Sequence, residues 1–370
     1  MKSYSPRALR AFGLCCALVT ASALLESTVL IVQSQETVSV SYDQKRFVGR
    51  PLFQSSNQTI LLARDGRVRR LPGSNRASVE TISNEFVSYN HAELDKRLRK
   101  EFGPTFEVTF TQHYVVVHPQ GQKQLWASRF EDLFVNFKHY FTVRGLSPNE
   151  PEFRLIALVF HNRGEFMAYS QRMKEPIDGR MVGYYSSRTN RIALYDSSNG
   201  GENLKRWKED AATIYHEAAH QAAFNCGIHH RFTGPPRWVS EGLGTLFEAP
   251  GVWNGTTYIG RDARINRRML ETFQREFIET GDALDLEALI SNDKIFQSDP
   301  QRGYALAWAL SFYLSETQPD NYLKLLQQTS SKQSFQRVES LERRHDWDAV
   351  MTTPMASLER HMKDYFQKLD

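Results

Sequence analysis

The stretch Tyr-His-Glu-Ala-Ala-His-Gln at residues 215–221 is the strongest indication in this sequence of a particular fold. On an α-helix, residues four positions apart lie on the same face one turn apart, so His216 and His220 point in the same direction. Two imidazoles with this spacing can bind one Zn²⁺ ion. Glu217 can take a proton from a water molecule that the ion activates. The alternative is a helix that carries two surface histidines.

The surrounding sequence favours the metal site. A helix is predicted from Trp207 to Asn225, with Gly227 just past its end. Alanines lie on several of its sides and allow close approach of neighbouring elements, so we expect this helix to be buried. Because unpaired buried polar groups are costly, two buried histidines need partners, and a metal ion would satisfy both.

A catalytic zinc site needs a third protein ligand and an open position for water. Glu241 is the best candidate for the third ligand, in a second helix predicted between Pro236 and Pro250. Glu248 lies on the same face of this helix and is expected to contact a ligand histidine or solvent. The alternative for Glu241 is a solvated surface carboxylate.

Two glycines, Gly242 and Gly244, follow the candidate ligand. Each is unfavourable in a helix by about 1 kcal/mol relative to Ala. A close approach of this helix to another helix or to the metal would explain both of them.

The order HExxH and then Glu-x-x-Gly resembles the gluzincin clan of zinc metallopeptidases. More closely, the chain from about Phe106 to its C-terminus resembles a bacterial family of uncharacterised, gluzincin-like peptidases. That pattern has Ala where this chain has Gly244, a substitution that is conservative in size. The matching segments are Gly183-Tyr184-Tyr185, Asn190-Arg191-Ile192, Leu194-Tyr195, residues 216–221, Pro236-x-Trp238-x-Ser240-Glu241-Gly242-Leu243, Phe247-Glu248 and residues 304–310.

The resemblance implies a zincin-like α+β fold and zinc metallopeptidase activity, and it is silent about the substrate. We expect a domain boundary after residue 78. Residues 79–370 would form a gluzincin-like metallopeptidase domain, with an N-terminal α/β half over 79–227 and a helical C-terminal half over 228–370. Residues 36–78 would form a small β module, in which Asp65-Gly66 marks the turn of a hairpin.

Residues 1–35 are predicted to be a signal peptide or an N-terminal anchor. Lys2, Arg7 and Arg10 precede an uncharged, mostly apolar run over residues 11–25. The run is shorter than the about 20 residues that span a bilayer, which favours a signal peptide. An uncleaved anchor that extends to Val32 is the alternative. Either reading places the rest of the protein outside the cytoplasm, with membrane association only through this segment.

Cysteine content and charge narrow the remaining possibilities. Of the three cysteines only Cys226 lies beyond the targeting segment, so no intramolecular disulfide is expected there, and Cys226 is expected to be a small buried side chain. The net charge of +4, without a basic run that contains aromatic residues, gives no indication of nucleic-acid binding. Nothing in the sequence indicates an oligomeric state.

The predicted α/β half contains a helix over residues 91–102, a strand over 106–118, an aromatic-striped helix, a buried strand over 153–161 and a hairpin over 183–196. In gluzincins an edge strand beside the active helix pairs with the extended substrate. The resemblance implies this role for the 183–196 hairpin, and an ordinary surface hairpin is the alternative.

Tyr304 and the remaining histidines are further candidates for site residues. Tyr304 begins a predicted helix, and gluzincin aminopeptidases carry a comparable Tyr that stabilises the tetrahedral intermediate, so it is a candidate catalytic residue; a packing role is the alternative. His229 and His230 are adjacent and lack helical spacing to His220, so we expect surface histidines. His113, His161, His345 and His361 are isolated and receive the same interpretation.

The sequence therefore favours zinc-dependent peptide-bond hydrolysis, with His216, His220 and Glu241 as ligands, Glu217 as general base and Tyr304 assisting. The zinc ion would lower the pKa of its bound water, and the substrate would be a peptide or protein outside the cytoplasm. The alternative is a non-catalytic extracytoplasmic binding or structural protein that retains the zinc site.

Overall fold

The computed structural model describes residues 35–72, 78–177, 181–197 and 204–369. The expected targeting segment lies outside these residues except for its last position. Within the described ranges, no helix is both long enough and apolar enough to cross a membrane.

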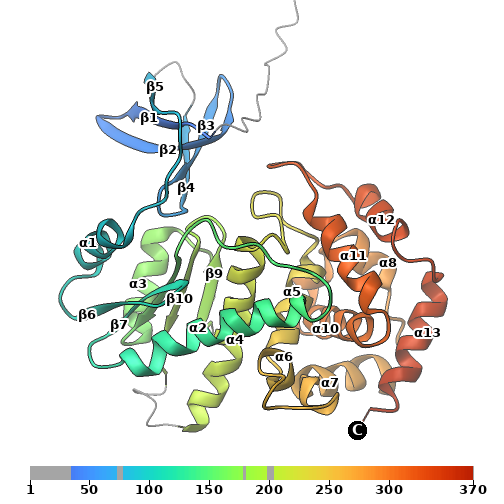
Figure 1. The fold of residues 1–370 in the computed structure, drawn as a ribbon. Helices are drawn as coiled ribbons and strands as arrows, with labels where there is room; N and C mark the ends of the chain where they lie inside the picture. Colours follow the sequence, from blue (N-terminus) through green and yellow to red (C-terminus); the bar gives the residue numbers. More distant parts are fainter. Residues whose placement is uncertain (1–34, 73–77, 178–180, 198–203, 370) are drawn as a thin grey trace, which may run out of the picture.

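The N-terminal β module is an antiparallel sheet with strand order β4-β3-β2-β1-β5, at the top of Figure 1. Its strands are β1 (Thr37–Tyr42), β2 (Lys45–Gln54), β3 (Gln58–Ala63), β4 (Val68–Pro72) and β5 (Ser78–Ser83). The predicted hairpin is confirmed: β3 pairs with β4, and Gly66 in the turn has φ of +80°, which few other residues adopt. Because β5 pairs with β1, the sheet continues past the boundary that we expected at residue 78.

The second sheet is mixed and has strand order β6-β7-β8-β10-β9. Its strands are β6 (Phe106–Phe110), β7 (Tyr114–Pro119), β8 (Leu155–Phe160), β9 (Gly183–Ser186) and β10 (Arg191–Tyr195). The prediction of one strand over residues 106–118 was wrong, because the chain turns at residues 111–113 and β6 pairs antiparallel with β7. The predicted 183–196 hairpin is present as β9 and β10, with β9 at the edge of the sheet.

Alternating side chains of the central strands enter two different cores. On one face, Leu155, Ala157 and Val159 pack against α2 (Lys123–Thr142) and α4 (Leu204–Asn225). On the other, Ile156, Leu158 and Phe160 pack against α1 (His91–Phe102) and α3 (Arg163–Met173). This pattern follows from the two-residue period of a strand, and it explains why β8 is apolar along its whole length.

The C-terminal half is helical, as predicted, and adjoins the α4 side of the sheet (Figure 1). Its core is continuous with the core under α2 and α4, and Cys226 is buried in that core as expected. The chain is thus an α+β protein, which confirms the predicted fold class. The helical elements are α5 (Arg237–Phe247), α6 (Pro250–Trp253), η2 (Asp262–Arg264), α7 (Arg267–Phe273), η3 (Gln274–Glu279), α8 (Leu286–Ser291), α9 (Ile295–Ser298), α10 (Pro300–Thr317), α11 (Pro319–Ser330), α12 (Ser340–Asp348) and α13 (Met355–Phe366).

A cluster of charged side chains joins the β module to the second sheet. Arg191 on β10 is 1% exposed and forms a two-pronged ion pair with Glu101 on α1, at 2.8 and 3.1 Å. Asp65 in the β3–β4 turn lies 3.8 Å from Arg191 and 2.6 Å from Arg67. The turn of the module is therefore held against the sheet by buried charges that compensate one another.

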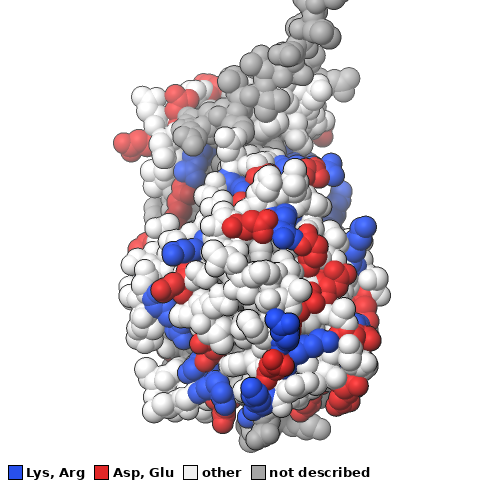
Figure 2. All heavy atoms as spheres, turned by 90° about the vertical axis from the view of Figure 1, so that its right-hand side faces the viewer, with Lys and Arg blue, Asp and Glu red and all other residues white. Residues whose placement is uncertain are grey.

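Charges of both signs are interspersed over the face that Figure 2 shows. Among the side chains drawn there in colour or in white, no continuous basic stripe runs across this face. The face does not have the charge distribution that tracks a nucleic-acid backbone.

Candidate metal centre

Helix α4 presents His216 and His220 on one face, as the spacing predicts, and their ring centroids lie 4.6 Å apart. Helix α5 packs directly on this face at Gly244. A Cβ at Gly244 would lie 2.7 Å from Cε1 of His216, and a Cβ at Gly242 would lie 2.7 Å from the carbonyl oxygen of Ala307 on α10. The close approach predicted from the two glycines is confirmed on both sides of α5. Although Gly and Ala differ little in size, the added Cβ of an Ala at position 244 would lie too close to the His216 ring.

The carboxylate of Glu241 faces both imidazoles. Its Oε2 lies 3.3 Å from Nε2 of His216 and 3.5 Å from Nε2 of His220, and the two nitrogens are 2.9 Å apart. Ligand atoms about 2.0–2.1 Å from a tetrahedral zinc ion are separated from one another by about 3.3 Å. Within the described residues these three form the one group of His, Cys, Asp or Glu with metal-binding geometry. The donor atoms therefore fit a zinc ion in both chemistry and spacing.

The second ring nitrogen of His216, Nδ1, also has a partner. Its Nδ1 lies 3.0 Å from Oε1 of Glu248, and Oε2 of Glu248 accepts a hydrogen bond from Nδ2 of Asn266 at 2.9 Å. Of the two environments expected for Glu248, a candidate ligand histidine or solvent, the structure shows contact with the histidine. A carboxylate on the far nitrogen fixes the orientation of the ring and the position of its proton.

The electrostatics of the cluster favour a bound cation. Burial opposes the ionisation of Glu241, but hydrogen bonds from His216 and His220 outweigh it and lower the pKa of this carboxyl. Burial opposes protonation of His216, but Glu241 and Glu248 outweigh it and hold the pKa of His216 well above 6.5. Two carboxylates thus concentrate negative charge around the imidazoles, which a cation would compensate.

Glu217 lies between the cluster and the edge strand β9. Its Oε2 accepts a hydrogen bond from the backbone N–H of Tyr185 at 2.7 Å. Burial raises the pKa of Glu217, while His216 and His220 oppose this change. A carboxylate with a raised pKa is a stronger base, as proton transfer near neutral pH requires.

The orientation of β9 follows from its pairing with β10. The N–H of Tyr195 donates to the carbonyl of Val182 at 3.2 Å, so Val182 and Tyr184 face β10. Because this direction alternates along an antiparallel strand, the backbone groups of Gly183 and Tyr185 face outward. The N–H of Tyr185 is taken by Glu217, and Gly183 lines the cleft described below.

Polar side chains tie the β9–β10 hairpin to α4. Nε2 of Gln221, next to His220, donates to the carbonyl oxygens of Asn190 and Ile156 at 3.0 and 3.1 Å. Asn225 bonds to the side chain of Asn190 at 2.8 Å. These bonds fix the rotation and height of α4 relative to the sheet, and therefore the direction in which its histidines point.

A cleft of about 520 Å³ opens beside the cluster. Tyr304, at the start of α10, lines it, and its ring centroid lies 6.5 Å from that of His216. The other lining residues are Met181, Val182, Gly183, Thr213, His216, Glu217, Thr245, Glu248, Arg268, Met269, Thr272, Pro300 and Gln301. Of the five predicted site residues, His216, Glu217 and Tyr304 line this cleft, and His220 and Glu241 complete the cluster beside it.

The prediction that His229 is a surface residue was wrong. Its side chain is 1% exposed, because the chain folds back after α4 and the N–H of His229 donates to the carbonyl of Ala223 at 3.0 Å. Burial is the main cause that lowers the pKa of His229 to about 3, and the nearby His220 adds to it. The His229 imidazole is therefore neutral. His230 is half-buried, and His113 is largely buried, with Nδ1 2.5 Å from Oε1 of Glu131.

One residue at the site, Arg237, was not predicted from the sequence. Arg237 precedes Glu241 by four positions on α5, and its Nε lies 3.5 Å from Oε1 of Glu241. Its NH2 group lies 3.5 Å from the hydroxyl oxygen of Tyr304. The i, i+4 spacing to the third ligand was a usable signal, since residues at this spacing are neighbours on a helix surface.

Residues 210–336 match a family described as "Protein of unknown function (DUF1570)". This stretch includes both histidines, Glu241 and Tyr304. No curated protein matches the chain.

Several solved structures are similar to the chain at low identity. The M60 catalytic domain of Clostridium perfringens ZmpC, in complex with the sialyl T antigen, is 10% identical, has a TM-score of 0.35, and is matched over 92% of this chain and 74% of that chain. The catalytic module of the metalloprotease ZmpA from Clostridium perfringens is 11% identical, with a TM-score of 0.34 and coverage of 92% and 72%. A metallopeptidase from Bacteroides thetaiotaomicron is 11% identical, with a TM-score of 0.34 and coverage of 82% and 52%.

Proposed function

We propose that this protein is a zinc-dependent peptidase of the gluzincin type. The observation that carries the proposal is the convergence of His216, His220 and Glu241, with donor atoms 2.9 to 3.5 Å apart, beside an open cleft. A structural zinc site is closed by four protein ligands, whereas a catalytic site keeps a position open. Three convergent donors beside a cleft match the catalytic arrangement.

The side chains around the cluster have separate tasks in the proposed reaction. A zinc ion, when bound, supplies a Lewis acid that activates water and polarises the carbonyl of the scissile bond. Glu217 takes a proton from the attacking water and passes it to the leaving amine, and the N–H of Tyr185 holds its other oxygen in place. The Tyr304 hydroxyl donates to the substrate oxygen on which negative charge develops.

The substrate is proposed to be an extended peptide that lies along β9. This strand is at the edge of its sheet, and the backbone groups of Gly183, which face away from β10 beside the cleft, would pair with the peptide. The proposed setting is outside the cytoplasm, on the basis of residues 1–35.

Two variants test the proposal. Glu217→Gln is expected to bind zinc as the wild type does and to lose hydrolysis of a peptide library, since the amide cannot accept the proton. Glu241→Ala is expected to lose zinc, measured by elemental analysis after dialysis. Retained turnover by Glu217→Gln would exclude the mechanism, and an unchanged zinc content in Glu241→Ala would reassign the third ligand.

A further inference from the structure

The side chain of Arg237 lies close to two groups of the proposed centre, the Glu241 carboxylate and the Tyr304 hydroxyl. The two oxygens of Glu241 have different neighbours: Oε2 faces the imidazoles at 3.3 and 3.5 Å, and Oε1 faces Nε of Arg237 at 3.5 Å. The guanidinium also lies 3.5 Å from the Tyr304 hydroxyl. We propose that Arg237 is a positioning residue that orients both the third ligand and the catalytic hydroxyl, an inference that rests on the proposed function.

The first consequence concerns the carboxylate. A guanidinium beside Oε1 competes with a cation for that oxygen, so Oε2 alone is left to bind the metal. The carboxylate would then hold a zinc ion through one oxygen, without rotating to bind through both. This leaves the open position that a reacting water and substrate need.

The second consequence concerns the direction of a proton. Arginine has five N–H donors and no acceptor, so the oxygen of Tyr304 can only accept from it. The hydroxyl hydrogen therefore points away from Arg237. Tyr304 lines the cleft, so the hydroxyl is directed to donate to a group bound there.

The position of Arg237 is fixed from several sides. Its guanidinium carbon lies 4.9 Å from the ring centroid of Phe296, and Phe296 packs edge-on against Tyr304 at 5.7 Å. Its backbone N–H donates to Oδ1 of Asp293 at 3.2 Å, and Asp293 accepts two hydrogen bonds from Arg343 at 2.8 and 3.0 Å.

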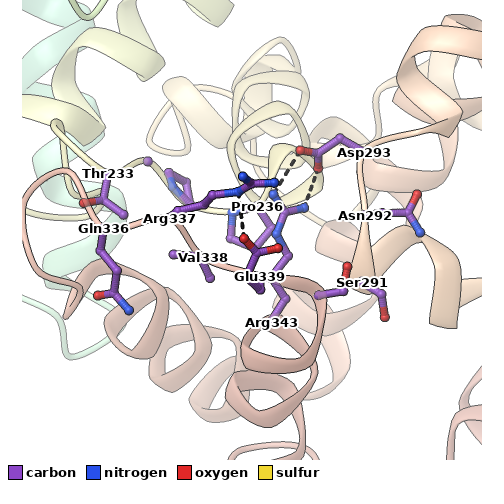
Figure 3. A pocket seen from close by; sticks show the side chains of 13 residues that line it. Thr233, Pro236, Ser291, Asn292, Asp293, Gln336, Arg337, Val338, Glu339 and Arg343 are labelled. Carbon is purple, nitrogen blue, oxygen red and sulfur yellow. Dashed lines mark hydrogen bonds and ion pairs between the residues drawn. The ribbon is translucent and has the colours of Figure 1, made fainter.

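Figure 3 shows the carboxylate of Asp293 turned toward Arg343 and toward the start of α5. Because α5 begins after Pro236 without a side-chain cap of its own, Asp293 supplies the acceptor for its first turn. Arg237 is therefore held at both its backbone and its side chain, as a positioning residue requires.

The test compares Arg237→Met and Arg237→Lys with the wild type. The control is Arg99→Met, which removes an i, i+4 ion pair of the same kind on α1. Arg237→Met is expected to weaken zinc binding, measured by chelator competition, and to lower kcat, each by about 10- to 100-fold, as loss of a contact that orients a metal ligand does. KM is expected to stay within about twofold. Arg237→Lys is expected to have a zinc affinity close to that of the wild type but a reduced kcat. The single ammonium group of Lys can pair with Glu241 but does not reach Tyr304 at the same time.

Two readouts separate this role from a structural one. The absorption spectrum of the cobalt-substituted protein is expected to change in Arg237→Met, because the carboxylate can then bind through both oxygens. Tyr304→Phe is expected to cost less in the Arg237→Met background than in the wild type, because the misdirected hydroxyl is already ineffective. An Arg237→Met protein that is folded by circular dichroism and keeps the zinc affinity, cobalt spectrum and kcat of the wild type overturns the inference.

Failure of the proposed function is distinguishable from failure of this inference. A wild-type protein that binds zinc but cleaves no peptide contradicts the proposed function, and zinc affinity and the cobalt spectrum still decide the role of Arg237 toward Glu241. A wild-type protein that binds no zinc overturns both.

Discussion

Replacing Gly244 with Ala tests how closely α5 approaches the metal centre. The added Cβ would lie 2.7 Å from Cε1 and 2.8 Å from Nε2 of His216, whereas ordinary contacts begin at 3.4 Å. The ring or the helix must move by the difference between 2.7 and 3.4 Å, which is 0.7 Å. Helix α5 cannot retreat, because Gly242 on its other side already touches α10. The ring of His216 must therefore move.

The magnitude follows from the geometry of metal binding. Zinc–ligand distances vary by only about 0.2 Å, so a ring that moves 0.7 Å must return to a strained position to bind zinc. Overpacking of this kind costs about 1–3 kcal/mol. At about 1.4 kcal/mol for each tenfold change, the zinc Kd is expected to rise about 5- to 150-fold. The stability of the metal-free protein should change less than zinc affinity, because Ala favours the helix by about 1 kcal/mol, which offsets part of the cost of moving the ring relative to Glu248.

The assay is chelator competition for zinc, together with thermal unfolding of the metal-free protein. Gly164→Ala on α3 is the matched control, since its added Cβ has one neighbour within 4 Å, the Asn162 side chain at 3.2 Å. Gly242→Ala is the contrasting variant: its Cβ would lie 2.7 Å from the backbone oxygen of Ala307, so the metal-free protein itself should lose stability. A Gly244→Ala protein with a zinc Kd within twofold of the wild type would refute the reasoning.

The remaining predictions concern stability. Burial opposes ionisation of Asp65 and Glu101, but Arg67 and Arg191 outweigh it and lower both pKa values, so the unfolded chain binds more protons than the folded one. Their contribution is therefore complete above about pH 5 and is lost as the pH falls below about 4.5, measured by urea unfolding against pH. Arg191→Met should cost about 3–5 kcal/mol at pH 7 and flatten this acid dependence, because it leaves buried carboxylates without a partner; an unchanged pH profile would contradict the assignment. Leu310→Ala, at a position 0% exposed on α10, should lower the free energy of unfolding by about 2–5 kcal/mol in chemical denaturation, and a loss below 1 kcal/mol would contradict its place in the core.

The sequence by itself determined the local features of this protein. The four-residue spacing of His216 and His220 sets their common direction on any α-helix, and Asp65-Gly66 sets a tight turn. The apolar run in β8 predicts a strand buried on both faces, as found. These predictions depend on interactions between residues that are close in the chain, which is why they could be made without coordinates.

Other features were decided only by the tertiary structure. His229 is buried because the chain folds back onto α4, and no local pattern encodes that contact. The same is true of the Tyr185 N–H on Glu217, of the Asp65 and Arg191 contact between the module and the sheet, and of the fit of Gly244 against His216. Each depends on the relative placement of elements that are distant in sequence, and that placement is set by the packing of the whole core.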